Sequence, residues 1–346
     1  MQPNHTLYMQ RALQLAEKGH GSVSPNPMVG CVIVHQNQII GEGWHQNYGQ
    51  AHAEVNAVAA VQNKALLAEA TAYVTLEPCS HFGKTPPCAD LLIKHKLKQV
   101  IICSQDPNPL VAGNGILKLQ NANIEVISGI LEAEGRVLNR RFFRMIEQKR
   151  PYVILKFAET QDGFMAEPNY QQVAISSAFS KLLVHRWRAE EDAIMIGKNT
   201  AKYDNPKLNV REWSGKNPVR VLIDRDLGLD NSLHVFDDSV QTICYNQHKT
   251  GTLGKQTQLQ VIDFEQNCIP QILADLHSRQ IQSLLVEGGP TLLQSFIDAN
   301  LYDEIRILQA PTQLHTGIAS PILPKNLIFE SNKIGVDVLK TAFKQS

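Results

Sequence analysis

The sequence predicts two consecutive α/β domains, and three observations lead to this fold class. The chain has 346 residues, which is enough for two hydrophobic cores. Runs of apolar, β-prone residues alternate with segments of helical periodicity in both halves of the chain. Between the halves, a helical segment loses its apolar period at Lys149-Arg150-Pro151, where the proline is expected to end it. We therefore expect domains at residues 1–148 and 149–346.

The first domain is predicted to begin with a helix and a β-hairpin. Residues 5–19 carry apolar side chains at helical spacing, and two glycines end the segment. Apolar runs at 29–34 and 39–44, joined by four polar residues, predict the hairpin. The remainder predicts a layered α/β arrangement, with helices at 52–62, 88–95 and 131–148 and strands at 70–76, 100–104 and 124–127.

The second domain is predicted to be another α/β unit. Its clearest strands are expected at 152–157, 193–196, 219–223, 283–286 and 305–309. Its clearest helices are expected at 180–189, 269–279 and 291–299. The stretch 224–268 has no clear pattern, and we assign no element to it.

The composition argues against several classes of function. Lys+Arg and Asp+Glu both number 33, so the chain has no overall basic field for a nucleic-acid backbone. No apolar run is long enough to span a bilayer, and the N-terminal residues do not resemble a secretion signal. Six cysteines are present, but a reducing compartment argues against a disulfide framework. We expect a cytoplasmic protein that acts on a small molecule, without a nucleic-acid or membrane partner.

The stretch 78–88, together with residues 52–54, predicts a catalytic zinc site. One imidazole and two thiolates, from His52, Cys79 and Cys88, suit zinc and leave a fourth position for water. Glu54 follows the histidine by two residues, where zinc-dependent base deaminases carry their proton shuttle; their signature is H-x-E followed by P-C…C. The pattern therefore predicts a hydrolytic deaminase.

A closed structural zinc site is the alternative reading of the same residues. It would need a fourth ligand, for which His81 is the only nearby candidate, and it would have no use for Glu54. The spacer between the two cysteines is longer than in C-x-x-C deaminases and carries Lys84. A basic loop beside the metal would suit an anionic substituent such as a phosphate, although Lys84 alone also fits a solvated surface charge.

Four motifs of this half resemble the deaminase half of the bifunctional riboflavin-biosynthesis deaminase–reductases: Ser24–Val34, Gly41–His45, His52–Val55 and Pro78–Cys88. The resemblance implies a cytidine-deaminase-like α/β/α layered fold, in which Glu54 shuttles protons and one zinc ion is bound by His52, Cys79 and Cys88. It also implies that the pyrimidine side of the substrate contacts Asn26 and His45, and that the ribose phosphate faces His81 and Lys84.

In the second half, Ser283–Thr291 predicts a strand, a glycine turn and a helix with Thr291 as a possible N-cap. Such a turn lets backbone amides and the helix dipole approach a phosphate closely. Neither this turn nor Gly113-Asn114-Gly115 forms G-x-G-x-x-G, so a Rossmann domain is not supported. From the residues alone, a plain strand–helix connection remains open.

The resemblance continues into the reductase half of the same family, through Val184–Ala189, Asp192–Gly197, Asp204–Arg211 and Val286–Leu292. It implies a dihydrofolate-reductase-like α/β fold that uses NADPH. By position, the residues expected to contact the cofactor are Ala158, Thr200, Asp204, Gly289, Pro290, Thr291, Leu292, Leu293, Gln294 and Ser295. Those expected to hold the substrate are Arg188, Leu208, Arg211 and Glu287.

The leading hypothesis is a bifunctional enzyme. Its first activity would be zinc-dependent deamination of a diaminohydroxy-ribosylaminopyrimidine 5′-phosphate to the aminouracil, and its second NADPH-dependent reduction of the ribosyl chain to ribityl. Self-association in the family makes a homodimer the expected assembly. Two alternatives remain open: a nucleic-acid base deaminase, and a second half that binds a nucleotide or regulates without reductase activity. The latter is motivated by departures from the family pattern at Glu159, Gln172, Ala174 and Arg225.

Overall fold

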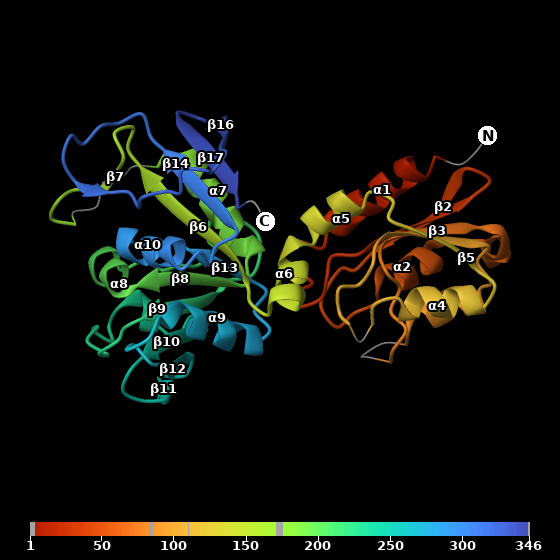
Figure 1. The fold of residues 1–346 in the computed structure, drawn as a ribbon, viewed down its shortest axis with the longest axis horizontal. Helices are drawn as coiled ribbons and strands as arrows, with labels where there is room; N and C mark the ends of the chain where they lie inside the picture. Colours follow the sequence, from red (N-terminus) through yellow and green to blue (C-terminus); the bar gives the residue numbers. More distant parts are fainter. Residues whose placement is uncertain (1–3, 83–85, 110, 171–175, 345–346) are drawn as a thin grey trace. The chain divides into compact units, whose positions relative to one another are not determined.

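The structure is a computed structural model that describes residues 4–82, 86–109, 111–170 and 176–344. The chain divides into two compact units, residues 1–149 and 150–346 (Figure 1). Within the described ranges, none of the helices combines the length and the apolarity that a membrane span requires.

The first unit contains a five-stranded sheet of order β2-β1-β3-β4-β5. Strand β1 pairs antiparallel with β2 and β3, and the pairs β3–β4 and β4–β5 are parallel. The strands are β1 (Gly30–His35), β2 (Gln38–Trp44), β3 (Thr71–Leu76), β4 (Gln99–Ser104) and β5 (Glu125–Ser128). A sheet that is buried on both faces needs a helical layer on each side.

Both faces of this sheet are covered by helices (Figure 1). Strand β1 buries Cys31 and Ile33 in one apolar cluster and Val32 and Val34 in the other, following the two-residue period of a strand. The first cluster is covered by α2 (Ala53–Ala60), η1 (Lys64–Glu69), α3 (Cys88–Lys94) and α4 (Asn114–Asn121). The second is covered by α1 (His5–Glu17) and α5 (Glu132–Leu138). The predicted α/β/α layering is confirmed.

Two local predictions in this unit need correction. The hairpin connection has two residues, Gln36 and Asn37, because His35 already pairs with Gln38. Both turn residues have positive φ, 48° and 62°, as the type I′ turn that matches strand twist requires.

The single helix predicted over 131–148 is also wrong, because the segment forms α5 and α6 (Arg140–Gln148) with a break at Asn139. The buried side chain of Asn139 accepts a hydrogen bond from Met28 N and donates one to Met28 O, both at 2.8 Å. The amide thereby satisfies the backbone N–H and carbonyl groups of Met28, just before β1. Periodicity cannot reveal this interaction, because the two residues are distant in sequence.

The second unit is built on a ten-stranded sheet of order β11-β12-β10-β9-β8-β13-β6-β14-β17-β16. All neighbours from β12 to β14 are parallel, and β11, β17 and β16 add antiparallel edges. The parallel strands are β6 (Tyr152–Glu159), β8 (Ala193–Gly197), β9 (Val219–Ile223), β10 (Thr242–Asn246), β12 (Thr257–Val261), β13 (Ser283–Val286) and β14 (Glu304–Gln309). The antiparallel strands are β11 (Gly251–Leu253), β16 (Glu330–Ile334) and β17 (Asp337–Phe343). A separate two-stranded sheet pairs β7 (Phe164–Ala166) with β15 (Ile318–Ala319).

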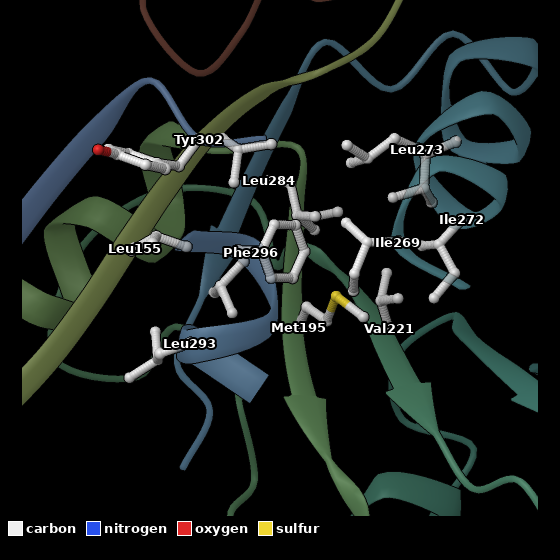
Figure 2. Close-up of a cluster of buried hydrophobic side chains, with 14 of the residues drawn as sticks. Leu155, Met195, Val221, Ile269, Ile272, Leu273, Leu284, Leu293, Phe296 and Tyr302 are labelled. Carbon is white, nitrogen blue, oxygen red and sulfur yellow. The ribbon is translucent and has the colours of Figure 1, made fainter. Parts of the chain in front are cut away.

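Helices cover both faces of the central strands of this sheet. One face packs α9 (Cys268–Ser278) and α10 (Pro290–Asp298), and the other packs α7 (Ala178–Glu190) and α8 (Lys198–Asp204). Figure 2 shows the first face, where Ile269 of α9 and Phe296 of α10 meet Met195 and Val221 of the strands. Within the stretch 224–268, where no element was assigned, the chain forms η2 (His234–Phe236), β10, β11 and β12.

A buried ion pair joins the start of β6 to the start of β14. The Arg150 guanidinium donates to both carboxylate oxygens of Asp303 at 2.7 and 2.8 Å, and Val153 N donates to the same carboxylate at 2.8 Å. The Asp303 side chain is only 1% exposed. Three donors therefore compensate a carboxylate that water does not reach.

Replacement of Asp303 by alanine is expected to lower the free energy of unfolding of the second unit by about 3–5 kcal/mol, because it leaves a buried guanidinium without its partner. Chemical denaturation followed by a signal from this unit measures the change. The control is Glu265→Ala, which removes an 88% exposed carboxylate 3.6 Å from Arg225 and should change stability by less than about 0.5 kcal/mol. Equal effects of the two substitutions would contradict the prediction.

Candidate active sites

In the first unit, three potential metal ligands converge from three elements. His52 is the N-cap of α2, Cys79 follows β3, and Cys88 is the first residue of α3. His52 Nδ1 lies 3.3 Å from Cys88 Sγ and 3.7 Å from Cys79 Sγ, and the three ligand atoms lie within 4.8 Å of one another. Tetrahedral zinc with bonds of about 2.0–2.3 Å separates such donors by roughly 3.5 Å. The donor types and their spacing therefore fit zinc.

The two thiols differ strongly in their acidity. Hydrogen bonding with Cys88 is the largest of the effects that lower the pKa of Cys79 to about 4, and His52 adds to it. The same contact with Cys79, together with burial, raises the pKa of Cys88. Cys79 Sγ also accepts a hydrogen bond from Cys88 N at 3.3 Å. Because a cation is bound by thiolates, metal binding would release the thiol protons from this pair.

Glu54 lies in the first turn of α2, two residues after the N-cap His52, and is only 3% exposed. Burial is the largest effect that raises the pKa of Glu54 to about 7, and the Cys79 charge adds to it. His52 and Cys88 oppose this shift. Each of the three potential ligands therefore affects the Glu54 carboxyl group, through its charge or through a hydrogen bond.

Asn26 and His45 form a hydrogen-bonded pair beside His52. The His45 ring is buried and lies edge-on to the His52 ring, with centroids 5.4 Å apart. His45 Nδ1 lies 3.1 Å from the carbonyl oxygen of Ala51, so the ring donates there. Its Nε2 then accepts from Asn26 Nδ2 at 3.1 Å. Burial lowers the pKa of His45, which favours the neutral ring.

Of the residues expected to face a ribose phosphate, His81 is exposed and follows Cys79 by two positions. Lys84 lies outside the described residues. The structure thus brings Asn26 and His45 together with the ligand cluster, whereas it leaves His81 in solvent.

Sequence reasoning missed Glu77, which precedes the Pro78-Cys79 step. Glu77 is only 4% exposed, and its carboxylate accepts hydrogen bonds from four backbone N–H groups. Oε1 accepts from Gly115 and Ile116 at 2.9 and 3.3 Å, and Oε2 from Gly113 and Asp106 at 3.0 and 3.3 Å. The available signal was an acidic residue at the end of an apolar strand, where a buried charge needs partners.

In the second unit, Arg188 and Glu287 form a two-pronged ion pair. Arg188 Nε donates to Glu287 Oε1 at 3.0 Å, and its Nη2 donates to Oε2 at 2.8 Å. Lys156 Nζ lies 3.7 Å from the same carboxylate. Burial alone would raise the pKa of Glu287, but the charges of Arg188 and Lys156 lower it to about 2. Sequence reasoning missed Lys156, although a lysine within the apolar strand 152–157 was a visible signal.

The segment that carries Leu208 and Arg211 contacts Arg188 and His185 of α7 through its backbone. Arg188 Nη1 donates to the Asn209 carbonyl at 3.5 Å, and Arg211 N donates to His185 Nδ1 at 3.4 Å. Leu208 is buried with a left-handed φ of 51°. The Arg211 side chain is 52% exposed, and its Nη1 donates to Asn209 Oδ1 at 3.2 Å. The segment therefore lies beside α7, but the Arg211 guanidinium points to solvent.

The residues expected to contact a cofactor gather around the N-termini of α8 and α10. Gly289 is the N-cap of α10 and Pro290 its first residue, so Thr291 is inside the helix and not its cap. A Cβ on Gly289 would lie 3.7 Å from Thr200 Oγ1, and one on Gly197 would lie 3.9 Å from Leu292. A helix start with a glycine cap lets a phosphate approach the backbone amides, so the arrangement fits a nucleotide cofactor.

The remaining cofactor candidates have other contacts. Ala158 is partly buried near the end of β6, and Asp204 is the exposed last residue of α8. The side chain of Leu293 packs in the core shown in Figure 2. Ser295 Oγ donates to the Thr291 carbonyl at 2.9 Å, and Gln294 Nε2 donates to Asp298 at 2.8 Å.

Comparison with known proteins assigns each unit to a family. Residues 2–104 match the cytidine and deoxycytidylate deaminase zinc-binding region, and residues 151–328 match the RibD C-terminal domain. The riboflavin biosynthesis protein RibD of Aquifex aeolicus is 40% identical over 331 residues, covering 94% of this chain and 92% of the relative. That of Bacillus amyloliquefaciens is 38% identical over 334 residues, covering 94% and 89%.

Solved structures agree with this assignment over the whole chain. The diaminohydroxyphosphoribosylaminopyrimidine deaminase/5-amino-6-(5-phosphoribosylamino)uracil reductase of Thermotoga maritima has a TM-score of 0.91 and 34% identity, with 99% of each chain covered. A RibD structure from Acinetobacter baumannii has a TM-score of 0.87 and 34% identity, with 98% of each chain covered. The predicted fold class is confirmed for both halves. The chain belongs to the RibD family of bifunctional deaminase–reductases of riboflavin biosynthesis.

Proposed function

We propose that the first unit deaminates a diaminohydroxy-ribosylaminopyrimidine 5′-phosphate to the aminouracil, and that the second unit then reduces its ribosyl chain to ribityl with NADPH. The name of the Thermotoga maritima relative supports this pair of substrates. The observation that carries the proposal is the cluster of His52 Nδ1, Cys79 Sγ and Cys88 Sγ beside the buried Glu54. A structural zinc site would not require that carboxyl group.

In the deaminase, His52, Cys79 and Cys88 would hold zinc, which would supply the Lewis acidity that makes water nucleophilic near neutral pH. Glu54 takes the proton of the attacking water and passes it to the departing amine, as a general acid and base. Its burial excludes bulk water from this transfer.

The other proposed substrate contacts surround this cluster. Asn26 and His45 bind the pyrimidine, and the hydrogen bond from Asn26 to His45 orients both groups before substrate arrives. His81 and Lys84 face the ribose phosphate, which two basic groups would attract. The exposure of His81 is consistent with a group that meets an anion at the protein surface.

In the reductase, Arg188, Leu208, Arg211 and Glu287 hold the substrate. Glu287 fixes the plane of the Arg188 guanidinium through two hydrogen bonds. Arg211 is exposed and can contact the substrate phosphate, to which guanidinium geometry is suited. NADPH supplies the hydride and would be held by Ala158, Thr200, Asp204 and residues 289–295, with its phosphates near the N-terminus of α10.

The proposal is tested by an assay of the purified protein on the diamino phosphate, with and without NADPH. Ammonia release is expected without NADPH, and stoichiometric NADPH oxidation is expected when the deaminated product is supplied directly. Deamination without any NADPH oxidation would reduce the second unit to a nucleotide-binding or regulatory module. Absence of ammonia release from zinc-loaded protein would refute the deaminase assignment.

Replacement of Glu54 by glutamine is expected to leave the zinc content near one per chain and to reduce ammonia release by at least about 100-fold, because the proton carrier is lost. Cys88→Ser is the contrasting variant, since it should lower the zinc content itself. Metal analysis and ammonia release are measured on the same samples. Full activity of the Glu54 variant would exclude the proton-transfer role, and unchanged zinc in the Cys88 variant would exclude that ligand.

Replacement of Glu287 by glutamine is expected to lower kcat/KM for NADPH-dependent reduction by about 30-fold or more, since one partner of a buried charge pair is neutralised. Ammonia release by the same preparation should not change, which provides an internal control. Arg186→Gln is the matched variant on α7, because its ion pair with Glu190 lies at the surface. A reductase that tolerates both substitutions equally would argue against the role of Glu287.

We also predict that the protein is a homodimer. Light scattering coupled to size-exclusion chromatography should give twice the mass of one chain at micromolar concentration. A monomeric mass would contradict this prediction without bearing on either activity.

A further inference from the structure

The buried carboxylate of Glu77 is compensated by backbone amides. No ion pair of Glu77 is found in the part of the chain that the structure describes, and the residue is 4% exposed. Four N–H groups, those of Asp106, Gly113, Gly115 and Ile116, lie 2.9–3.3 Å from its two oxygens. A buried negative charge needs such pairing, so these contacts hold the backbone at Asp106 and at Gly113–Ile116 close to Glu77.

The same residue is fixed on the strand side. Glu77 N donates to the Ser104 carbonyl at 2.9 Å, which continues the pairing of β3 with β4. Gly115 and Ile116 belong to the first turn of α4, where the helix dipole favours a carboxylate. Through its hydrogen bonds, Glu77 therefore connects the ends of β3 and β4 with the start of α4.

Glu77 precedes Cys79 by two residues in the sequence. An added Cβ on Gly115 would lie 2.1 Å from the Pro78 carbonyl oxygen, so α4 packs directly against the connecting peptide. Pro78 also restricts the backbone through its fixed φ. On its other side, Cys79 is held by α3, through Cys88 N to its sulfur at 3.3 Å and Ala89 N to its carbonyl at 3.1 Å. The backbone of Cys79 is thus held from two sides, by Glu77 through Pro78 and by the start of α3.

We propose that Glu77 is a positioning residue for the metal centre: its carboxylate holds the Pro78-Cys79 peptide so that Cys79 Sγ stays in register with His52 Nδ1 and Cys88 Sγ. This inference rests on the proposed zinc site. It assigns to Glu77 no contact with substrate or metal. Outer residues that orient ligands typically affect metal affinity or activity by about 10–100-fold, and this is the size of effect we expect.

The test compares Glu77→Gln with Leu119→Ala. Glutamine keeps the size of the side chain but replaces one acceptor oxygen with an NH2 group, which cannot accept from the two N–H groups that face it. Leu119 is fully buried in α4 and belongs to the apolar cluster on that face of the sheet, so its truncation should weaken the packing of α4 while the four hydrogen bonds to Glu77 can still form. Both variants are made in the full chain, and circular dichroism checks their folding.

Two readouts report on ligand geometry. The rate of zinc transfer to a chromophoric chelator should rise about 10–100-fold in Glu77→Gln and less than threefold in Leu119→Ala. In the cobalt-substituted protein, the visible bands and the thiolate-to-cobalt charge-transfer band should shift only in Glu77→Gln. Equal transfer rates and unchanged spectra in the two variants would overturn the inference.

A measurement on the unsubstituted protein keeps the inference testable if Glu77→Gln does not fold. If the backbone that pairs with Glu77 influences zinc binding, then bound zinc must influence that backbone to the same extent. Removal of zinc should therefore increase the rate of hydrogen exchange in peptides covering 111–117 at least tenfold more than in peptides covering 99–103. Equal acceleration in both regions would reject the role of Glu77. An unsubstituted protein that binds no zinc would instead reject the proposed metal site, which separates the two failures.

Discussion

The arrangement of both units depends on one constraint, namely that polar groups buried at strand ends must find partners within the protein. Glu77 at the end of β3 is paired by backbone amides, and Glu287 at the end of β13 is paired by Arg188 and Lys156. Asp303 at the start of β14 is paired by Arg150. Leaving any of these carboxylates unpaired would cost several kcal/mol, so their partners fix the loops and helices around them.

This constraint explains why the candidate sites lie where strands end. Strand β3 leads through Glu77 to Cys79, and β13 leads through Glu287 to the glycine cap of α10. In each case, a paired carboxylate comes immediately before the residues that would meet a metal or a phosphate. Open α/β sheets bind ligands beyond the carboxyl ends of their parallel strands, and a rigid strand end gives the site a fixed geometry.

Local motifs predicted the zinc cluster and most of the regular elements. Residues such as His52 and Cys88 could be identified because their spacing and chemical type alone specify the chemistry. Five of the parallel strands of the second sheet, β6, β8, β9, β13 and β14, were predicted because they are largely apolar, as strands buried on both faces must be. The parallel strands β10 and β12 in 224–268 were missed because polar residues such as Thr242, Asn246, Gln258 and Gln260 interrupt their apolar pattern.

The residues that sequence reasoning missed act through partners far away in the chain. Asn139 interrupts a helical period because its amide pairs with Met28, and Glu77 pairs with the start of a helix that had not been predicted. Neither contact has a signature in local periodicity. For Lys156, the charge within an apolar strand was visible, but its partner Glu287 could be assigned only from the sheet order, in which β6 and β13 are neighbours.

The sheet and its loops also account for Glu159, one of the departures from the family pattern. Glu159 is 9% exposed, and its carboxylate accepts hydrogen bonds from Gln309 Nε2 at 3.0 Å and from Ser320 Oγ at 2.7 Å. Arg225 is exposed and donates to Gln247 Oε1 at 2.8 Å, whereas Gln172 and Ala174 lie outside the described residues. Both described substitutions are satisfied by local partners and leave the Arg188–Glu287 pair intact. They therefore give no physical reason to deny reductase chemistry to the second unit.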